Sequence, residues 1–217
     1  MSASTNAYRT PDSGRDWGLS TAQLGVVAIV SLLTLASRLI DSPVANLSTM
    51  AALALFAGTV IRHPIGILLP LAIRVLTDGI VHLQTGYGFF PSWPFDYSAY
   101  VLIYVIGIAI PKRPLTGQAA SPWRLTGRIA AVLGGTSLSV AIYFGLSNFG
   151  VWKMWPDTYP PTAAGLIDCF TKALPFVKGT IWGNMIAGPL FYAAWYLVSA
   201  SVVEEQRVGS LLASADE

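Results

Sequence analysis

The chain has 217 residues, of which 53% are hydrophobic and only 11% are charged, and its formal net charge is +2. Soluble domains carry about 25% charged residues, so this composition predicts an integral membrane protein whose surface contacts the lipid bilayer, with no room for a separate soluble domain. The small net charge is spread over the chain, which argues against nucleic acid as a partner. The single cysteine excludes an internal disulfide and a cysteine-rich metal centre.

Six apolar segments follow one another along the chain. They are, in order, residues 21–40, 49–61, 65–83, 98–111, 127–146 and 179–201. The fold class that they predict is all-α, a polytopic membrane bundle of about six transmembrane helices plus one short interfacial or half-inserted helix. A polar N-terminal segment, 1–20, and a polar C-terminal tail, 202–217, flank this single transmembrane domain of residues 21–201.

The starts of the first two segments are informative. Ser20 and Gln23 match a helix capping box, although basic residues upstream leave a cleaved signal peptide as the alternative. The second segment, 49–61, is too short to cross a hydrocarbon core of about 30 Å, so either the preceding turn dips into the membrane or the helix begins earlier. Non-helical backbone at that depth is tolerated only beside protein or a wet cavity, and the loop 41–48 is therefore a candidate cavity wall.

The third segment contains Arg74, Asp78 and His82, which share one helical face at a spacing of four residues. Ionisable groups at membrane depth are costly unless they are paired or hydrated, and they normally face the bundle interior. Two interpretations stay open, namely a structural ion pair of Arg74 with Asp78, or contact of these side chains with a ligand or ion. If the pair is structural, replacing both partners should cost less stability than replacing Asp78 alone.

Residues 147–178 form the most patterned stretch of the chain. Aromatic residues alternate with turn formers up to Tyr159, which predicts a loop at the lipid–water boundary. Thr162 is then a plausible N-cap for a helix that Pro175 ends or kinks, giving about 14 residues and roughly 20 Å. We expect this helix to lie near the membrane surface, with its apolar stripe against the bundle and with Asp168 and Lys172 paired at i, i+4.

The same stretch carries a family resemblance through the strings NFGVW, YP-x-T, GL-x-x-CF and ALPF, together with ALALFAG and PLA…TD earlier in the chain. These strings resemble the signature of an uncharacterised family of small bacterial integral-membrane proteins, sometimes grouped with the substrate-binding S components of energy-coupling-factor (ECF) vitamin transporters. The resemblance implies a multi-pass protein of the bacterial inner (cytoplasmic) membrane that binds a vitamin-like molecule. The chain departs from the pattern at Asn184, where the family usually has an acid.

Basic residues are unevenly divided between the two predicted sides of the membrane. One side holds Arg9, Arg15, Arg62, Lys112, Arg113, Arg124, Arg128 and Arg207, and the other holds Arg38, Lys153, Lys172 and Lys178. By the positive-inside rule, both termini are cytoplasmic and the stretch 147–178 faces out.

Small residues recur every fourth position on the last two segments. The two stripes are Gly127, Ala131 and Gly135, and then Gly179, Gly183 and Ala187. Such stripes let helix backbones approach closely, and we expect them to form the bundle's own contacts rather than docking sites for another chain.

No catalytic or metal-binding motif is present, so we expect neither an enzyme nor a cofactor. The first hypothesis is an S-component-like protein that holds a small molecule in an outward-facing cavity walled by 41–48, the outer end of the third segment and 147–178. Its candidate contacts are Asp78, His82, Trp152, Asp168, Lys172 and Asn184. The second is a non-catalytic accessory subunit that binds other membrane protein subunits, which the polar tails favour.

Overall fold

The computed structural model describes residues 18–40, 46–116 and 121–215, and every regular element in these ranges is helical. The helices in chain order are α1 (Thr21–Leu39), α2 (Met50–Val60), the short 3-10 helix η1 (Pro64–Ile67), α3 (Leu68–Thr85), α4 (Trp93–Ile108), α5 (Pro122–Met154) and α6 (Ala163–Ala215). Four segments, namely α1, η1 with α3, α5, and α6, are long and apolar enough to cross a membrane. The predicted all-α, membrane-spanning fold is thus confirmed.

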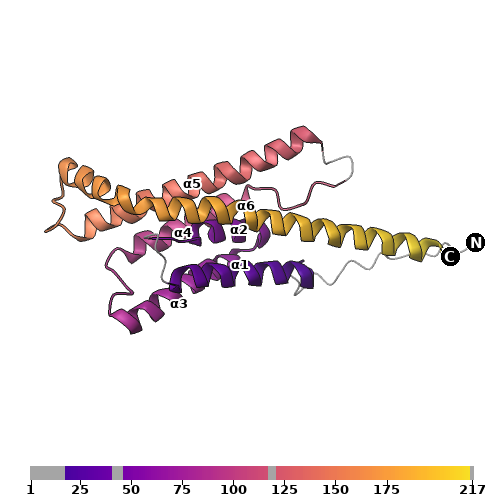
Figure 1. The fold of residues 1–217 in the computed structure, drawn as a ribbon, viewed down its shortest axis with the longest axis horizontal. Coiled ribbons are helices and arrows are strands. Elements are labelled where there is room, and N and C mark those ends of the chain that lie inside the picture. Colours follow the sequence, from indigo (N-terminus) through magenta and orange to yellow (C-terminus); the bar gives the residue numbers. More distant parts are fainter. Residues whose placement is uncertain (1–17, 41–45, 117–120, 216–217) are drawn as a thin grey trace, which may run out of the picture.

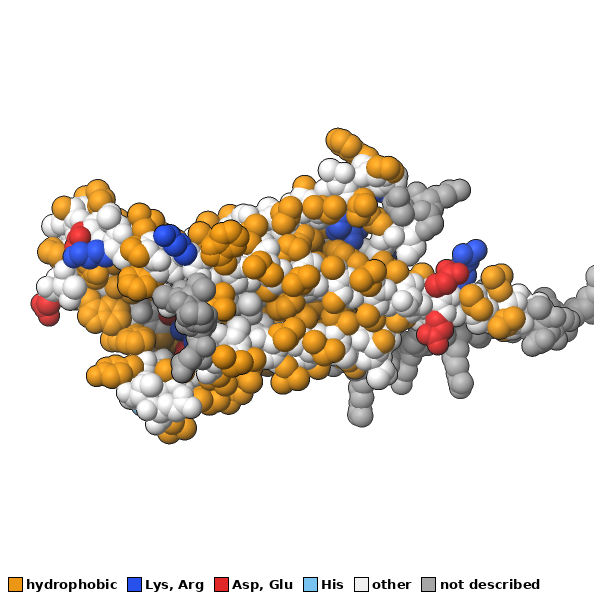
Figure 2. All heavy atoms as spheres, in the orientation of Figure 1, with side chains coloured by type: hydrophobic (Ala, Val, Ile, Leu, Met, Phe, Trp, Pro, Cys, Tyr) orange, Lys and Arg blue, Asp and Glu red, His pale blue; other side chains and the backbone are white. Residues whose placement is uncertain are grey.

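The helices run along one long axis, and α6 continues well past the rest of the bundle (Figure 1). Figure 2 shows a face covered mostly by hydrophobic side chains between the two ends, with most charged side chains towards the ends. Exposed apolar side chains along the middle of a bundle are what a lipid environment favours.

Helix α2 is the core of the molecule. All of its residues are buried, and it touches each of the other α-helices. A helix that is apolar on every side is stable only when it is surrounded in this way. Three aromatic side chains of α6 pack edge-on against Phe56 of α2, with ring centroids 5.7 to 6.1 Å apart, namely Phe191, Tyr192 and Trp195. The short second segment is therefore enclosed by protein, and its length need not match the bilayer.

The crossing of α2 and α4 depends on two glycines. A Cβ at Gly58 would collide with the Tyr104 carbonyl, and one at Gly107 would collide with the Leu55 carbonyl. At the same crossing, the hydroxyl of Thr59 donates a hydrogen bond to the Gly107 carbonyl oxygen at 2.8 Å. Backbone contact between these helices therefore requires the absence of side chains at both positions.

The prediction of a boundary loop at 147–152 is wrong. These residues form the last turns of α5, which ends at Met154. Gly150 lies against the ring of Phe95, and the rings of Phe149 and Phe95 meet edge-on at 5.7 Å. The aromatic residues that suggested an interfacial loop instead pack α5 against the start of α4, and this tertiary packing overrides the turn signals.

The prediction of a separate interfacial helix is also wrong. Thr162 does cap the helix, because its Oγ1 accepts a hydrogen bond from the Gly165 N–H at 3.1 Å. However, Pro175 lies inside α6, which continues without a break to Ala215. Figure 1 shows the orange start of α6 inclined to the rest of the helix. Proline bends rather than ends helices in membranes when neighbouring groups compensate for the lost hydrogen bond.

The apolar stripe predicted for this segment faces the bundle only in part. Phe170 is half-buried and meets the ring of Phe144 edge-on at 5.6 Å, whereas Ile167 and Leu174 are exposed. The full cost of a buried phenylalanine is therefore not expected at Phe170. The described part of the predicted C-terminal tail is a continuation of α6.

The two small-residue stripes differ in their surroundings. Gly179, Gly183 and Ala187 are buried, and a Cβ at Gly183 would lie 2.5 Å from the Ser48 carbonyl oxygen. On α5, Gly135 lies beside Leu55 and Ala131 is half-buried, but Gly127 is exposed with no atom near its missing side chain. Gly127 is thus not a packing residue in the described structure, because this first part of α5 has no neighbouring helix close to it.

We predict that Gly107→Ala destabilises the protein by about 1–3 kcal/mol or more, because the added methyl group must push α2 and α4 apart. Gly134→Ala is the matched control, since Gly134 also lies within a helix but has open space around it. That change should be neutral or slightly stabilising. Thermal unfolding in a mild detergent measures both, and equal stability of the two variants would contradict the close crossing.

Candidate functional site

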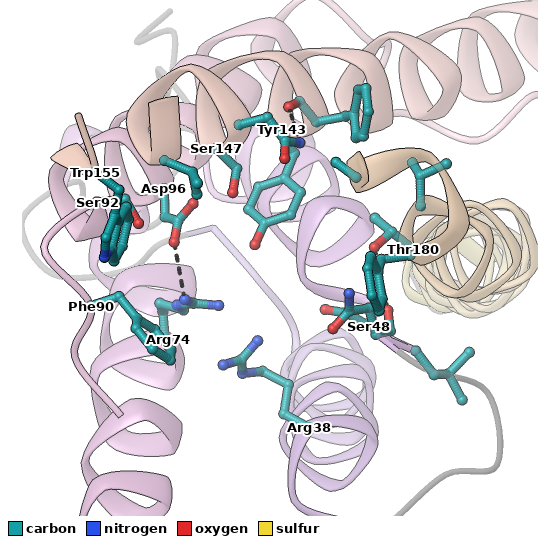
Figure 3. A pocket seen from close by; sticks show the side chains of 18 of the residues that line it. Arg38, Ser48, Arg74, Phe90, Ser92, Asp96, Tyr143, Ser147, Trp155 and Thr180 are labelled. Carbon is teal, nitrogen blue, oxygen red and sulfur yellow. Dashed lines mark hydrogen bonds and ion pairs between the residues drawn. The ribbon is translucent and has the colours of Figure 1, made fainter. Parts of the chain in front are cut away.

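A cavity of about 780 Å³ lies where α1 and α5 end and where α4 and α6 begin. Ser48, Arg74, Phe90, Tyr143, Trp155 and Thr180 are among the side chains that line it (Figure 3). It is bordered by residues 46–48 and by several residues of 147–177, as the first hypothesis expects of its walls. Residues 41–45 of the predicted wall lie outside the described residues.

A cluster of buried charges forms the floor of this cavity. Arg74 Nε lies 2.7 Å from Asp78 Oδ2, so the predicted ion pair within α3 is present. Arg38, from the end of α1, donates to the same carboxylate at 2.8 Å and to Thr77 at 2.7 Å. The Tyr97 hydroxyl donates to Asp78 at 3.2 Å. Asp78 is 3% exposed, so these partners replace the water that its charge would otherwise require.

Asp96, in the first turn of α4, extends the cluster to a fourth charge. Arg74 Nη2 lies 3.4 Å from Asp96 Oδ2, as the dashed line in Figure 3 marks. The other oxygen, Oδ1, is buried and accepts no hydrogen bond of good geometry among the described residues, although the Ser147 hydroxyl faces it (Figure 3). Buried polar atoms without a partner are rare and point to a missing water or ligand.

Aromatic rings fix the position of Arg74. Its guanidinium lies 5.9 Å from the ring centroid of Tyr100, which stacks on Tyr143 with centroids 5.2 Å apart. Tyr143 in turn directs its hydroxyl into the cavity (Figure 3). The arginine is therefore held by α4 and α5 as well as by its carboxylate partners, which keeps its free donors aimed in one direction.

The wall at residues 46–48 is held by Asn184. Its side-chain amide donates to the Ser48 and Thr180 carbonyl oxygens, each at 2.8 Å, and accepts from the Ala52 N–H at 2.7 Å. An amide supplies a donor and an acceptor together, whereas an ionised carboxylate supplies acceptors alone. The N-cap residue of α2, Thr49, makes no capping hydrogen bond with its side chain. Asn184 of α6 instead accepts from a backbone N–H in the first turn of α2, which links the two helices.

A model of one protein family, described as a family of unknown function (DUF6580), matches residues 19–207. The chain belongs to this family. The match covers the described cavity and its floor, so both lie within the DUF6580 domain. No curated protein and no solved structure matches the chain.

None of the six predicted ligand contacts of this DUF6580 protein lines the cavity. Asp78 is buried and forms ion pairs with Arg38 and Arg74, which line the cavity in its place. Asn184 is fully buried in the cavity wall. His82 is exposed, with its ring 5.9 Å from that of Phe89. The described side chains that face the cavity are other residues, among them Arg38, Arg74 and Asp96.

The remaining predicted contacts bind residues of α6 or of the connection between α5 and α6. Trp152 donates from its indole nitrogen to the Pro160 carbonyl at 3.0 Å. Asp168 and Lys172 form the predicted i, i+4 pair at 2.7 Å, and Lys172 lies 5.5 Å from the centroid of the Tyr159 ring. Both partners are partly exposed to the surroundings, and neither lines the cavity.

Sequence reasoning missed Arg38, Asp96 and Tyr143 as site residues. Arg38 and Asp96 lie near the ends of apolar segments, where charged residues usually mark the membrane boundary. Only the folded bundle brings them to the Arg74–Asp78 pair. Among the described residues, no group of three side chains of the metal-binding types lies close enough to hold a metal ion.

We predict that Asp78→Asn destabilises the protein by about 3–5 kcal/mol, because it leaves Arg38 and Arg74 buried without their shared carboxylate. Asp168→Asn is the matched control, since that pair has the same spacing and the same 2.7 Å distance but is exposed. The control should unfold almost as the wild type does. Thermal unfolding in detergent provides the comparison, and equal losses would mean that burial of the cluster does not matter.

The double replacement of Arg74 and Asp78 should not restore stability fully. The sequence predicts relief because it shows a single pair, but Arg38 depends on the same carboxylate. The double variant leaves Arg38 uncompensated and should remain clearly less stable than the wild type.

Proposed function

We propose that this membrane protein binds a small molecule, in the manner that its sequence resemblance to the S components of ECF transporters implies, as a step in uptake. The observation that carries the proposal is the cavity of about 780 Å³ with buried charges on its floor. Ligand sites usually measure about 300–1,000 Å³ and combine apolar walls with a few polar groups. Ionisable residues inside a membrane bundle are typical of substrate sites.

Binding rather than catalysis is the role that we propose for the cavity. Its described lining combines apolar and aromatic side chains with a few polar groups, as ligand-binding pockets do. Its aromatic members, such as Phe90 and Trp155, have ring centroids 6.5 Å apart and offer flat apolar surface to a solute.

We place the protein in the bacterial cytoplasmic membrane, with the cavity facing out and both termini in the cytoplasm. The support is the excess of Lys and Arg in the segments at the opposite end from the cavity. This orientation suits a protein that receives its solute from outside.

An accessory subunit of a larger membrane complex is the second candidate. The end of α6 favours it, because residues 202–214 continue the helix past the bundle and most are exposed. Four large apolar side chains are exposed on this extension, namely Val203, Val208, Leu211 and Leu212. Cross-linking from the extension to another membrane protein would favour this candidate.

The binding function predicts that a small molecule co-purifies with the protein in mild detergent, detectable by native mass spectrometry. Ser147→Phe should abolish its retention, because the new ring would occupy the cavity that Ser147 lines. Ser137→Phe makes the same change at an exposed position of α5 that does not line the cavity, and it should retain the molecule. Equal retention by both variants, or none by the wild type, would contradict the proposal.

The proposed topology predicts labelling by a membrane-impermeant thiol reagent in intact cells. In a Cys169→Ala background, a probe in Lys153→Cys should react because position 153 lies at the cavity end of α5. A probe in Lys112→Cys should stay unreactive, because it lies in the loop at the other end. Reaction at position 112 alone would reverse the orientation.

A further inference from the structure

The buried end of the cavity presents hydrogen-bond donors and one unpaired acceptor side by side. A guanidinium has five N–H donors, and the contacts of Arg38 with Thr77 and Asp78 use two of them. Figure 3 shows the guanidiniums of Arg38 and Arg74 pointing into the space bordered by Asp96, Ser147 and Tyr143. Part of each arginine's donor capacity therefore faces the solute space.

The acceptor is Asp96 Oδ1. The residue is 8% exposed, and among the described residues the Ser147 hydroxyl is the protein donor that faces this oxygen, without an aligned hydrogen bond. A buried carboxylate oxygen without a donor is unfavourable, so an occupant that donates to it is preferred over one that does not. An occupant with an N–H or O–H at this point therefore gains a hydrogen bond that other occupants lack.

The charges at this end cancel. Arg38 and Arg74 contribute two positive charges, and Asp78 and Asp96 contribute two negative ones. The other described residues that line the cavity are uncharged at neutral pH. An ionic solute would add a net charge to a cluster of largely buried side chains whose charges already balance, and it would leave behind part of its own hydration.

We propose that the cavity takes a solute whose buried end is a net-neutral polar group, with an acceptor for Arg38 and Arg74 next to a donor for Asp96. Primary amides, ureido groups and lactams belong to this class. The inference rests on the proposed binding function and adds the chemistry of the recognised group. The aromatic rings of Phe90, Tyr143 and Trp155 would contact the body of such a solute.

Four probes of nearly equal size and shape test this class, namely 4-fluorobenzamide, 4-fluorobenzoate, 4-fluorobenzamidinium and 4-fluoroacetophenone. They are respectively neutral with donor and acceptor, anionic, cationic, and neutral with an acceptor alone. Fluorine NMR titrations against the full-length protein in detergent give each affinity. Ser147→Phe in the same detergent corrects for partition of the probes into micelles.

We expect 4-fluorobenzamide to bind the wild type at least fivefold more tightly than each of the other probes. Asp96→Asn should reverse the order in favour of 4-fluorobenzoate, because two arginines would then face a single remaining carboxylate. If that variant does not fold, the ranking on the wild type decides alone.

A preference of the wild type for 4-fluorobenzoate or 4-fluorobenzamidinium would overturn the neutral class while leaving the binding function in place. An affinity for 4-fluoroacetophenone equal to that for the amide would overturn the role of Asp96. Equal signals for the wild type and Ser147→Phe with every probe would also overturn the inference. The co-purification experiment would then judge the binding function separately, because it depends on no probe.

Discussion

The buried carboxylate of Asp78 is the interaction on which the cavity end of this bundle depends. It binds arginines from two different helices, Arg38 of α1 and Arg74 of α3, and Arg74 also reaches Asp96 of α4. These ion pairs join three helices at one point. Separating the helices there would leave at least one buried charge without its partner, which is costly in free energy. Association of helices in lipid lacks a hydrophobic driving force, so such polar contacts and close packing decide how the helices meet.

Close packing supplies the second half of the arrangement. The crossing of α2 and α4 at Gly58 and Gly107 places α2 in the centre, and Asn184 fastens the start of α2 to α6. Together these contacts leave one end of the bundle filled and the other end hollow. The cavity is therefore a consequence of a central helix that is shorter than its neighbours.

Composition and apolar runs were sufficient to predict the helical membrane fold, the shortness of the second segment and the Arg74–Asp78 pair, because these depend on local spacing. The prediction failed at 147–152 and at Pro175, where turn-forming residues lie inside helices held by neighbouring rings and helices. It also missed Arg38 and Asp96, since their partners are distant in sequence and only tertiary structure brings them together. Two of the three expected walls border the described cavity in part, at 46–48 and within 147–177, whereas the third segment contributes Arg74 and not its outer end.

The brevity of α2 also sets the electrical thickness of the protein. Eleven residues at about 1.5 Å each span roughly 16 Å, about half of a hydrocarbon core of about 30 Å. Ser48, just ahead of α2, lines the cavity, so the filled protein beneath its floor is little thicker than that helix. With the open cavity filled by water, a membrane voltage would fall mainly across α2. Arg38 and Arg74 would then lie at the edge of the field rather than at its centre.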